Sequence, residues 1–201
     1  MISPLIIMIV LWLSLITYAV LGGADFGGGV WALLAQGPDA PKQRQLVEHA
    51  VGPVWEANNV WLIFLVVGLY IAFPPAAYTI AVALFIPFTL IVLGVVLRGA
   101  SFAFSTHIGR AVRVRAAWSV AFSAASIITP FLLGCVAAAI ASGQIRYIDG
   151  NVQADRWAPW LTPFALSVGA VALAMCATLA AVFLTVEAQF DQDVVMMGAF
   201  R

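Results

Sequence analysis

The chain has 201 residues, of which 64% are apolar and 9% are charged, and its formal net charge is zero. A soluble domain carries about 25% charged residues, so this chain has too few charges to cover a surface that faces water. The lack of a positive net charge argues against nucleic acid as a partner. The apolar runs are long and continuous, which indicates membrane helices and not a barrel.

Five apolar runs are long enough to cross a bilayer as helices. We therefore expect an all-α integral membrane protein with a single transmembrane domain over residues 1–201. Its architecture should be an antiparallel four-helix bundle plus a fifth span. The expected spans cover about residues 4–34, 51–73, 77–98, 116–142 and 160–187.

The connections between the runs are polar, and they set the expected orientation. Gln36 to Glu48 should form a loop, and Pro74-Pro75 a tight turn. Of the nine Lys and Arg residues, only Arg146 and Arg156 lie on the side that precedes the fifth span. Basic residues accumulate on the cytoplasmic side, so we expect the N-terminus outside.

Two carboxylates lie within the apolar runs, Asp25 in the first and Glu56 in the second. An ionised group at membrane depth costs about 2.5–3.5 kcal/mol on insertion scales, so it should be paired, protonated or functional. The expected topology places both acids near the cytoplasmic side, where Arg98 ends the third run. Such a cluster is typical of either a proton path or a buried ion pair.

The neighbours of Glu56 are the amides Asn58 and Asn59 and the indole of Trp55. Asn59 follows Glu56 by three residues, so we expect the two side chains on one helix face. A carboxyl group in apolar surroundings suits proton exchange near neutral pH. The alternative is a polar cluster at the start of a helix, with Pro53 in its first turn.

Other polar and flexible positions leave two interpretations open. Arg98 is either an anchor at the membrane interface or an ion-pair partner. Trp55 more often packs than takes part in chemistry. The stretch Gly22–Gly29 holds Asp25 among five glycines, which allow either a close approach of helices or a break in the first one.

The sequence offers no clear ligand for a metal or a haem. Cys135 and Cys176 lie in apolar runs, as small core residues do. His49 and His107 fall in the expected loops, and a haem held by this chain alone would need axial ligands inside the bundle. We therefore expect no cofactor-binding and no metal-binding residue. Met8 and Met175 are the remaining candidates, and both are expected to be core.

Three motifs resemble subunit II of cytochrome bd-type quinol oxidases. Gly23–Gly27 is similar to the family's Gly-Phe-Asp-Leu/Met-Gly, and Trp55–Trp61 to Trp-Asp-Gly-Asn-x-Val-Trp. Phe73–Tyr78 and Leu97–Phe102 are similar to Phe-Pro-x-x-Tyr and Leu-Arg-x-x-x-Phe. The second motif is the most specific, since residue order, spacing and helix position all agree.

This chain also departs from the family pattern. Glu56 stands where the family usually has Asp, Ala57 replaces a glycine, and Gly22 stands where many members have another acid. Family members usually have eight spans, whereas five are expected here. By this resemblance we expect a truncated, split or short variant of such a subunit.

The resemblance implies a role in a respiratory quinol oxidase that reduces O2 to water. A partner, subunit I, would carry haem b, haem d and the quinol site. This chain would stabilise that partner and supply a cytoplasmic proton path. Glu56 and Asp25 would be the acids of the path, supported by four neighbouring side chains: Trp55, Asn58, Asn59 and Arg98.

The same resemblance implies a multi-pass protein of a bacterial or archaeal cell membrane, in contact with lipid. A small accessory subunit or a second half-subunit could complete the assembly. Two other functions remain open from the residues. One is half of a proton-coupled transporter, because glycine-rich broken spans near charges also occur in transporters. The other is an assembly factor without chemistry.

Overall fold

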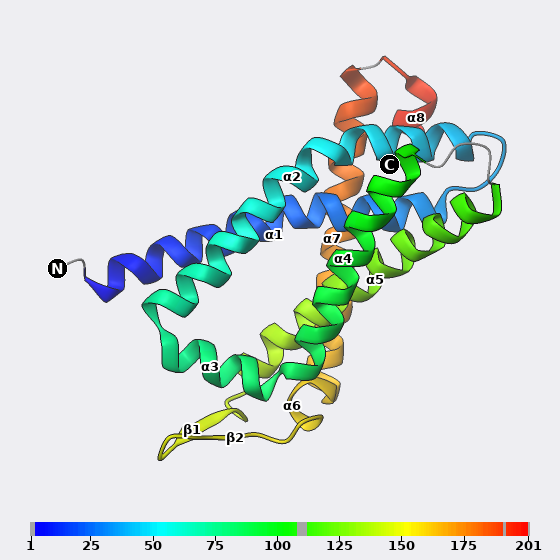
Figure 1. The fold of residues 1–201 in the computed structure, drawn as a ribbon. Helices are drawn as coiled ribbons and strands as arrows, with labels where there is room; N and C mark the ends of the chain where they lie inside the picture. Colours follow the sequence, from blue (N-terminus) through cyan, green and yellow to red (C-terminus); the bar gives the residue numbers. More distant parts are fainter. Residues whose placement is uncertain (1–2, 108–111, 191, 201) are drawn as a thin grey trace.

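The computed structural model describes residues 3–107, 112–190 and 192–200, and these residues are mainly helical (Figure 1). The long helices are α1 (Pro4–Leu34), α2 (Ala40–Ala72), α4 (Phe85–His107), α5 (Val112–Ala141) and α7 (Pro163–Phe190). The short elements are α3 (Pro74–Ala83), β1 (Arg146–Ile148), β2 (Asn151–Gln153), α6 (Ala158–Leu161) and α8 (Val194–Ala199). The strands β1 and β2 pair antiparallel as a hairpin.

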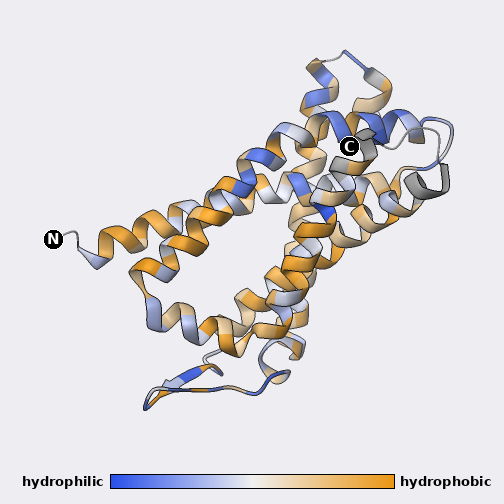
Figure 2. Ribbon diagram, in the orientation of Figure 1, coloured by the Kyte–Doolittle hydropathy of each residue, from blue (hydrophilic) through white to orange (hydrophobic). Residues whose placement is uncertain are grey.

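The membrane class expected from the composition is confirmed. Among the described residues, four helices are long and apolar enough to cross a membrane, namely α1, α2, α5 and α7. A fifth span results if the bent pair α3–α4 is counted as one. Apolar residues fill the middle of these helices, and hydrophilic residues gather in the first half of α2 and in the β1–β2 hairpin (Figure 2).

The connection between α1 and α2 is shorter than the expected loop from Gln36 to Glu48. Helix α2 already begins at Ala40, with Pro41 in its first turn, where a missing N–H leaves no hydrogen bond unmade. The Arg44 side chain then donates hydrogen bonds to the carbonyls of Ala32 and Ala35. These carbonyls belong to the unsatisfied C-terminal end of α1, so the start of α2 caps the helix before it.

The segment expected as the third span, residues 77–98, is not one straight helix. The chain bends by 88° between α3 and α4, around Leu84. Pro87 explains the bend, because a proline ring in a helix clashes with the carbonyl four residues earlier, here that of Ala83. Pro74-Pro75 do not form a separate tight turn either, since α3 begins at Pro74.

Helix α1 lies at the centre of the packing, against α2, α5 and α7. In Figure 1, α1 and α2 run side by side and α7 crosses them. One apolar cluster, with Leu84, Leu132 and Ala165, lies near the β1–β2 hairpin. A second, with Val47, Leu184 and Phe200, joins α2 and α7 to the segment around α8. Asp25 belongs to neither cluster.

The glycines around Asp25 allow the close approach of helices and do not break α1, which continues from Pro4 to Leu34. A Cβ atom added at Gly27 would overlap the carbonyl oxygen of Cys176 in α7. One added at Gly29 would overlap the Ser126 hydroxyl in α5. Glycine is therefore required at both positions for α5 and α7 to reach the turn of α1 that carries Asp25.

Gly27→Ala should destabilise the protein, because the new methyl group meets a backbone atom that cannot move alone. Overpacking of this kind costs about 1–3 kcal/mol. The thermal midpoint of the purified protein measures the loss. Gly198→Ala is the matched control, since nothing lies within 4 Å of its added Cβ. Equal midpoints for the two variants would contradict the packing described here.

Candidate functional site

An ion pair between Asp25 of α1 and Arg98 of α4 lies inside the protein, and both side chains are only 2% exposed. The Nη2 of Arg98 donates to Oδ1 of Asp25 and also to the Asp25 main-chain carbonyl, at 3.1 Å. Arg98 is therefore an ion-pair partner and not an anchor at the membrane interface. The pair cancels two charges that would each be costly in a membrane.

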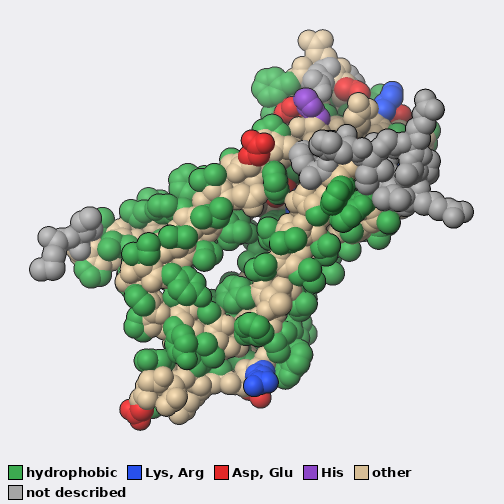
Figure 3. Space-filling view, viewed as in Figure 1, with side chains coloured by type: hydrophobic (Ala, Val, Ile, Leu, Met, Phe, Trp, Pro, Cys, Tyr) green, Lys and Arg blue, Asp and Glu red, His purple; other side chains and the backbone are tan. Residues whose placement is uncertain are grey.

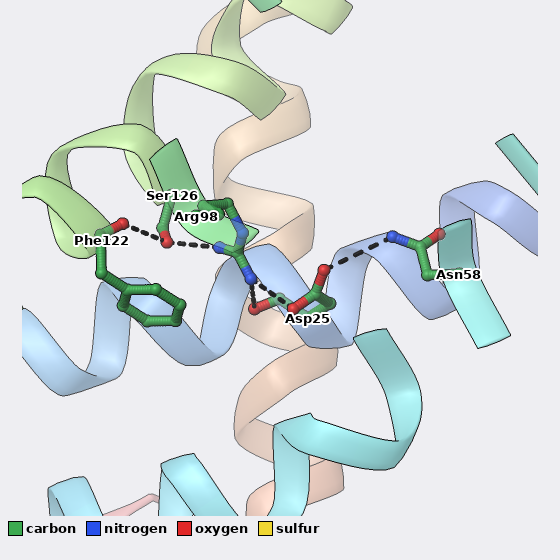
Figure 4. A network of polar contacts seen from close by, with 5 residues as sticks. All are labelled: Asp25, Asn58, Arg98, Phe122 and Ser126. Atoms are coloured by element: carbon green, nitrogen blue, oxygen red, sulfur yellow. Dashed lines mark hydrogen bonds and ion pairs between the residues drawn. The ribbon is translucent and has the colours of Figure 1, made fainter. Parts of the chain in front are cut away.

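Arg98 is held from its other side by α5 (Figure 4). Its Nη1 donates to the Ser126 hydroxyl, which donates in turn to the carbonyl of Phe122 at 2.6 Å. The guanidinium carbon lies 4.5 Å from the ring centre of Phe26 and 4.7 Å from that of Phe122. Cation–π contacts of this kind are stronger where water is excluded. The guanidinium is thus fixed by a carboxylate, a hydroxyl and two aromatic faces.

Helix α2 contributes the amide of Asn58, which is 3% exposed. Its Nδ2 donates to Oδ2 of Asp25 over 3.5 Å, which is long for a hydrogen bond. A cavity of about 10 Å³ lies beside this contact, and Trp55, Asn58 and Asn59 line it together with groups of α1 and α4. Positions 55, 58 and 59 lie on one helix face, which is therefore the face that α2 presents to the ion pair.

Glu56 lies outside this group, although the sequence places it among the same residues. Its side chain is exposed, and it does not line the cavity. Asn59, three residues later, lines the cavity, whereas Glu56 does not. The two acids are thus on different sides of α2: Asp25 is inside the bundle, and Glu56 is on its outer surface.

Two contributors were missed in the sequence, Ser126 and Tyr18. Ser126 is fully buried and binds Arg98, and the buried Tyr18 lines the cavity. The only local signal for Ser126 was a hydroxyl in an apolar run. Serine is frequent in membrane helices, where its hydroxyl often bonds to the carbonyl four residues earlier, so the signal was too weak to single it out.

The candidates for haem ligation do not fit an axial ligand inside the bundle. Met8 is 45% exposed and Met175 is 59% exposed. His49 is exposed and belongs to α2, not to a loop, while His107 is the last residue of α4 and its side chain is outside the description. Among the described residues, no three His, Cys, Asp or Glu side chains come together as a metal site.

Comparisons with known proteins agree on one family. A model of the family described as cytochrome bd terminal oxidase subunit II matches residues 3–198. The chain is 31% identical over 150 residues to the cytochrome bd ubiquinol oxidase subunit 2 of Bacillus subtilis, and 24% identical over 173 residues to the cytochrome bd-I ubiquinol oxidase subunit 2 of Escherichia coli K12. These matches cover 72% and 85% of this chain.

The fold is similar to that of a solved oxidase chain. In the bd oxidase from Geobacillus thermodenitrificans, the matching chain has a TM-score of 0.76 and 25% sequence identity, and the match covers 98% of this chain and 60% of that one. The chain spans less than half the length of the two curated relatives, 43% and 45%.

Replacing one partner of the ion pair should destabilise the protein more than replacing both. Asp25→Asn leaves the Arg98 charge buried without its counter-ion, which costs about 3–5 kcal/mol. The double variant Asp25→Asn with Arg98→Gln leaves no unpaired charge, so part of the loss should return. Thermal midpoints of the purified protein measure both effects.

The exposed Asp149, in the turn of the β1–β2 hairpin, provides the control variant Asp149→Asn, which should leave the midpoint unchanged. The contradicting result would be a double variant whose loss of midpoint equals the sum of the losses of the two single variants. It would show that the two side chains do not depend on each other.

Proposed function

Because this chain belongs to the cytochrome bd terminal oxidase subunit II family, we propose that it is the non-haem subunit of a membrane quinol:O2 oxidoreductase. It stabilises a haem-bearing subunit I and contributes a cytoplasmic proton path to the site of oxygen reduction. The observation that carries the proposal is the buried Asp25–Arg98 pair, whose two residues stand in motifs that resemble those of that family.

The exposed apolar surface supports the scaffolding role. Large apolar side chains on the outside of α1, α2, α4 and α7 include Trp12, Ile63 and Val92, each at least 60% exposed. The face in Figure 3 is covered by such side chains and is hollowed between α2, α3 and α4. These surfaces suit contact with lipid, with the partner subunit, and with a second half-subunit or small accessory subunit. In this arrangement the N-terminus is outside.

Glu56 is the group best placed to receive protons at the boundary of the chain. It is exposed at the surface of α2, next to Trp55, which lines the cavity on the inner side. A covering subunit would therefore meet the Glu56 carboxylate directly. Asp25 forms the inner part of the path, because its Oδ2 faces Asn58 and its Oδ1 is held by Arg98.

The haem groups belong to the partner in this proposal, because the candidates Met8, Met175 and His49 are exposed. Haem b and haem d would there supply electron transfer from quinol and the reduction of O2 to water. Each O2 takes up four electrons and four protons, and this chain's acids would deliver protons from the cytoplasm. The transporter and the assembly factor lose support, because the relatives named above are oxidase subunits.

Glu56→Gln should slow O2 consumption by the assembled complex while haem content stays unchanged. The amide keeps the size of the side chain and cannot release a proton. Loss of a proton-transfer group typically costs about 10²-fold or more in rate. Oxygen uptake with a quinol substrate, together with the haem absorption spectrum of the same sample, measures both quantities.

Glu48→Gln is the matched control, since Glu48 is another exposed glutamate of α2, two helical turns earlier. It should keep full turnover. Full turnover in Glu56→Gln as well would remove the proton role of Glu56. Loss of haem in that variant would instead assign it to assembly.

A further inference from the structure

The cavity beside the ion pair is polar in an otherwise apolar part of the protein. It has a volume of about 10 Å³ and lies between α1, α2 and α4. Its polar wall includes Tyr18, Asp25, Asn58, Asn59 and Arg98. A cavity needs about 10–15 Å³ to hold one water molecule, so this one is of the size of a single water and too small for an organic ligand.

Asn58 gives an independent indication that something polar is bound there. The side chain is 97% buried, and its Nδ2 is turned toward Asp25. Its Oδ1 has no hydrogen-bond partner among the described residues. A buried amide oxygen without a donor bears the full penalty of its lost hydration, and Asn58 lines a cavity from which a donor could reach it.

We propose that this cavity is a binding site for one water molecule, which donates a hydrogen bond to Oδ1 of Asn58 and contacts the Asp25 carboxylate. A buried water usually makes about three hydrogen bonds. The Asp25 carboxylate and the Tyr18 hydroxyl line the same cavity and supply the further partners.

The charges around the cavity select a neutral ligand. A metal cation would be repelled by the guanidinium of Arg98, and an anion by the carboxylate of Asp25, since both line the space. Water is small, neutral and able to donate and accept. The direct contact between Asn58 and Oδ2 of Asp25 is long, at 3.5 Å. The bound water would give the two side chains a second, bridging link. The site depends only on this chain's own residues and is independent of the proposed oxidase role.

A density map of the purified complex, at a resolution that shows ordered waters, tests the site. The wild-type map should contain one isolated peak in the cavity, about 2.5–3.0 Å from Oδ1 of Asn58. The site is overturned if ordered waters appear elsewhere in the chain and the cavity has no peak. It is equally overturned if Oδ1 of Asn58 accepts from a protein group.

Two variants sharpen the test. Asn58→Leu removes the amide, and the peak should disappear, whereas a peak that persists would show that Asn58 does not bind it. Thr129→Val is the control, because the Thr129 hydroxyl is also buried without a partner among the described residues but does not line this cavity. Its map should keep the peak. If Asn58→Leu fails to assemble, the wild-type map alone decides.

Discussion

The bond between Asp25 and Arg98 is the constraint on which the arrangement of the long helices depends. Moving a carboxylate and a guanidinium out of water costs several kcal/mol for each ion. This is offset only if the two meet directly and their remaining donors and acceptors are satisfied. The main-chain carbonyl of Asp25 and the Ser126 hydroxyl accept these further hydrogen bonds from Arg98. Four helices, α1, α2, α4 and α5, are thereby joined around one neutralised pair.

The residues around the pair explain the unusual composition of α1. Large side chains would keep α5 and α7 away from Asp25, and then neither Ser126 nor the aromatic face of Phe122 could reach the guanidinium. Gly27 and Gly29 remove that obstacle. The glycines around Asp25 are therefore part of the electrostatic site, although they carry no polar side chain. The two apolar clusters lie on either side and keep the pair away from the ends of the bundle.

The membrane class and the helical content could be predicted from the sequence. Asp25 and Arg98 could be singled out as a possible ion pair, because a charge inside an apolar run is conspicuous. For Glu56 the same reasoning fails, because its side chain is exposed. Its depth along the chain resembles that of a buried group, but two residues, or about 200° of helix rotation, separate it from Asn58 and turn it outward. Which face of α2 meets α1 is decided by the packing of several helices. The bend at Leu84 was foreseeable from Pro87, whereas the contact of Ser126 with Arg98 depends on the tertiary structure alone.

The separation of the two charges in the chain has a consequence for biosynthesis. Asp25 and Arg98 are 73 residues apart, and ribosomes add about 5–20 residues per second, so roughly 4–15 s pass between their translation. During this interval the first helix enters the translocon with a carboxyl group that has no counter-ion. Until the arginine arrives, the nascent chain must keep that group protonated, hydrated or near the lipid headgroups. The ion pair can therefore form only after the ribosome has added Arg98 of α4.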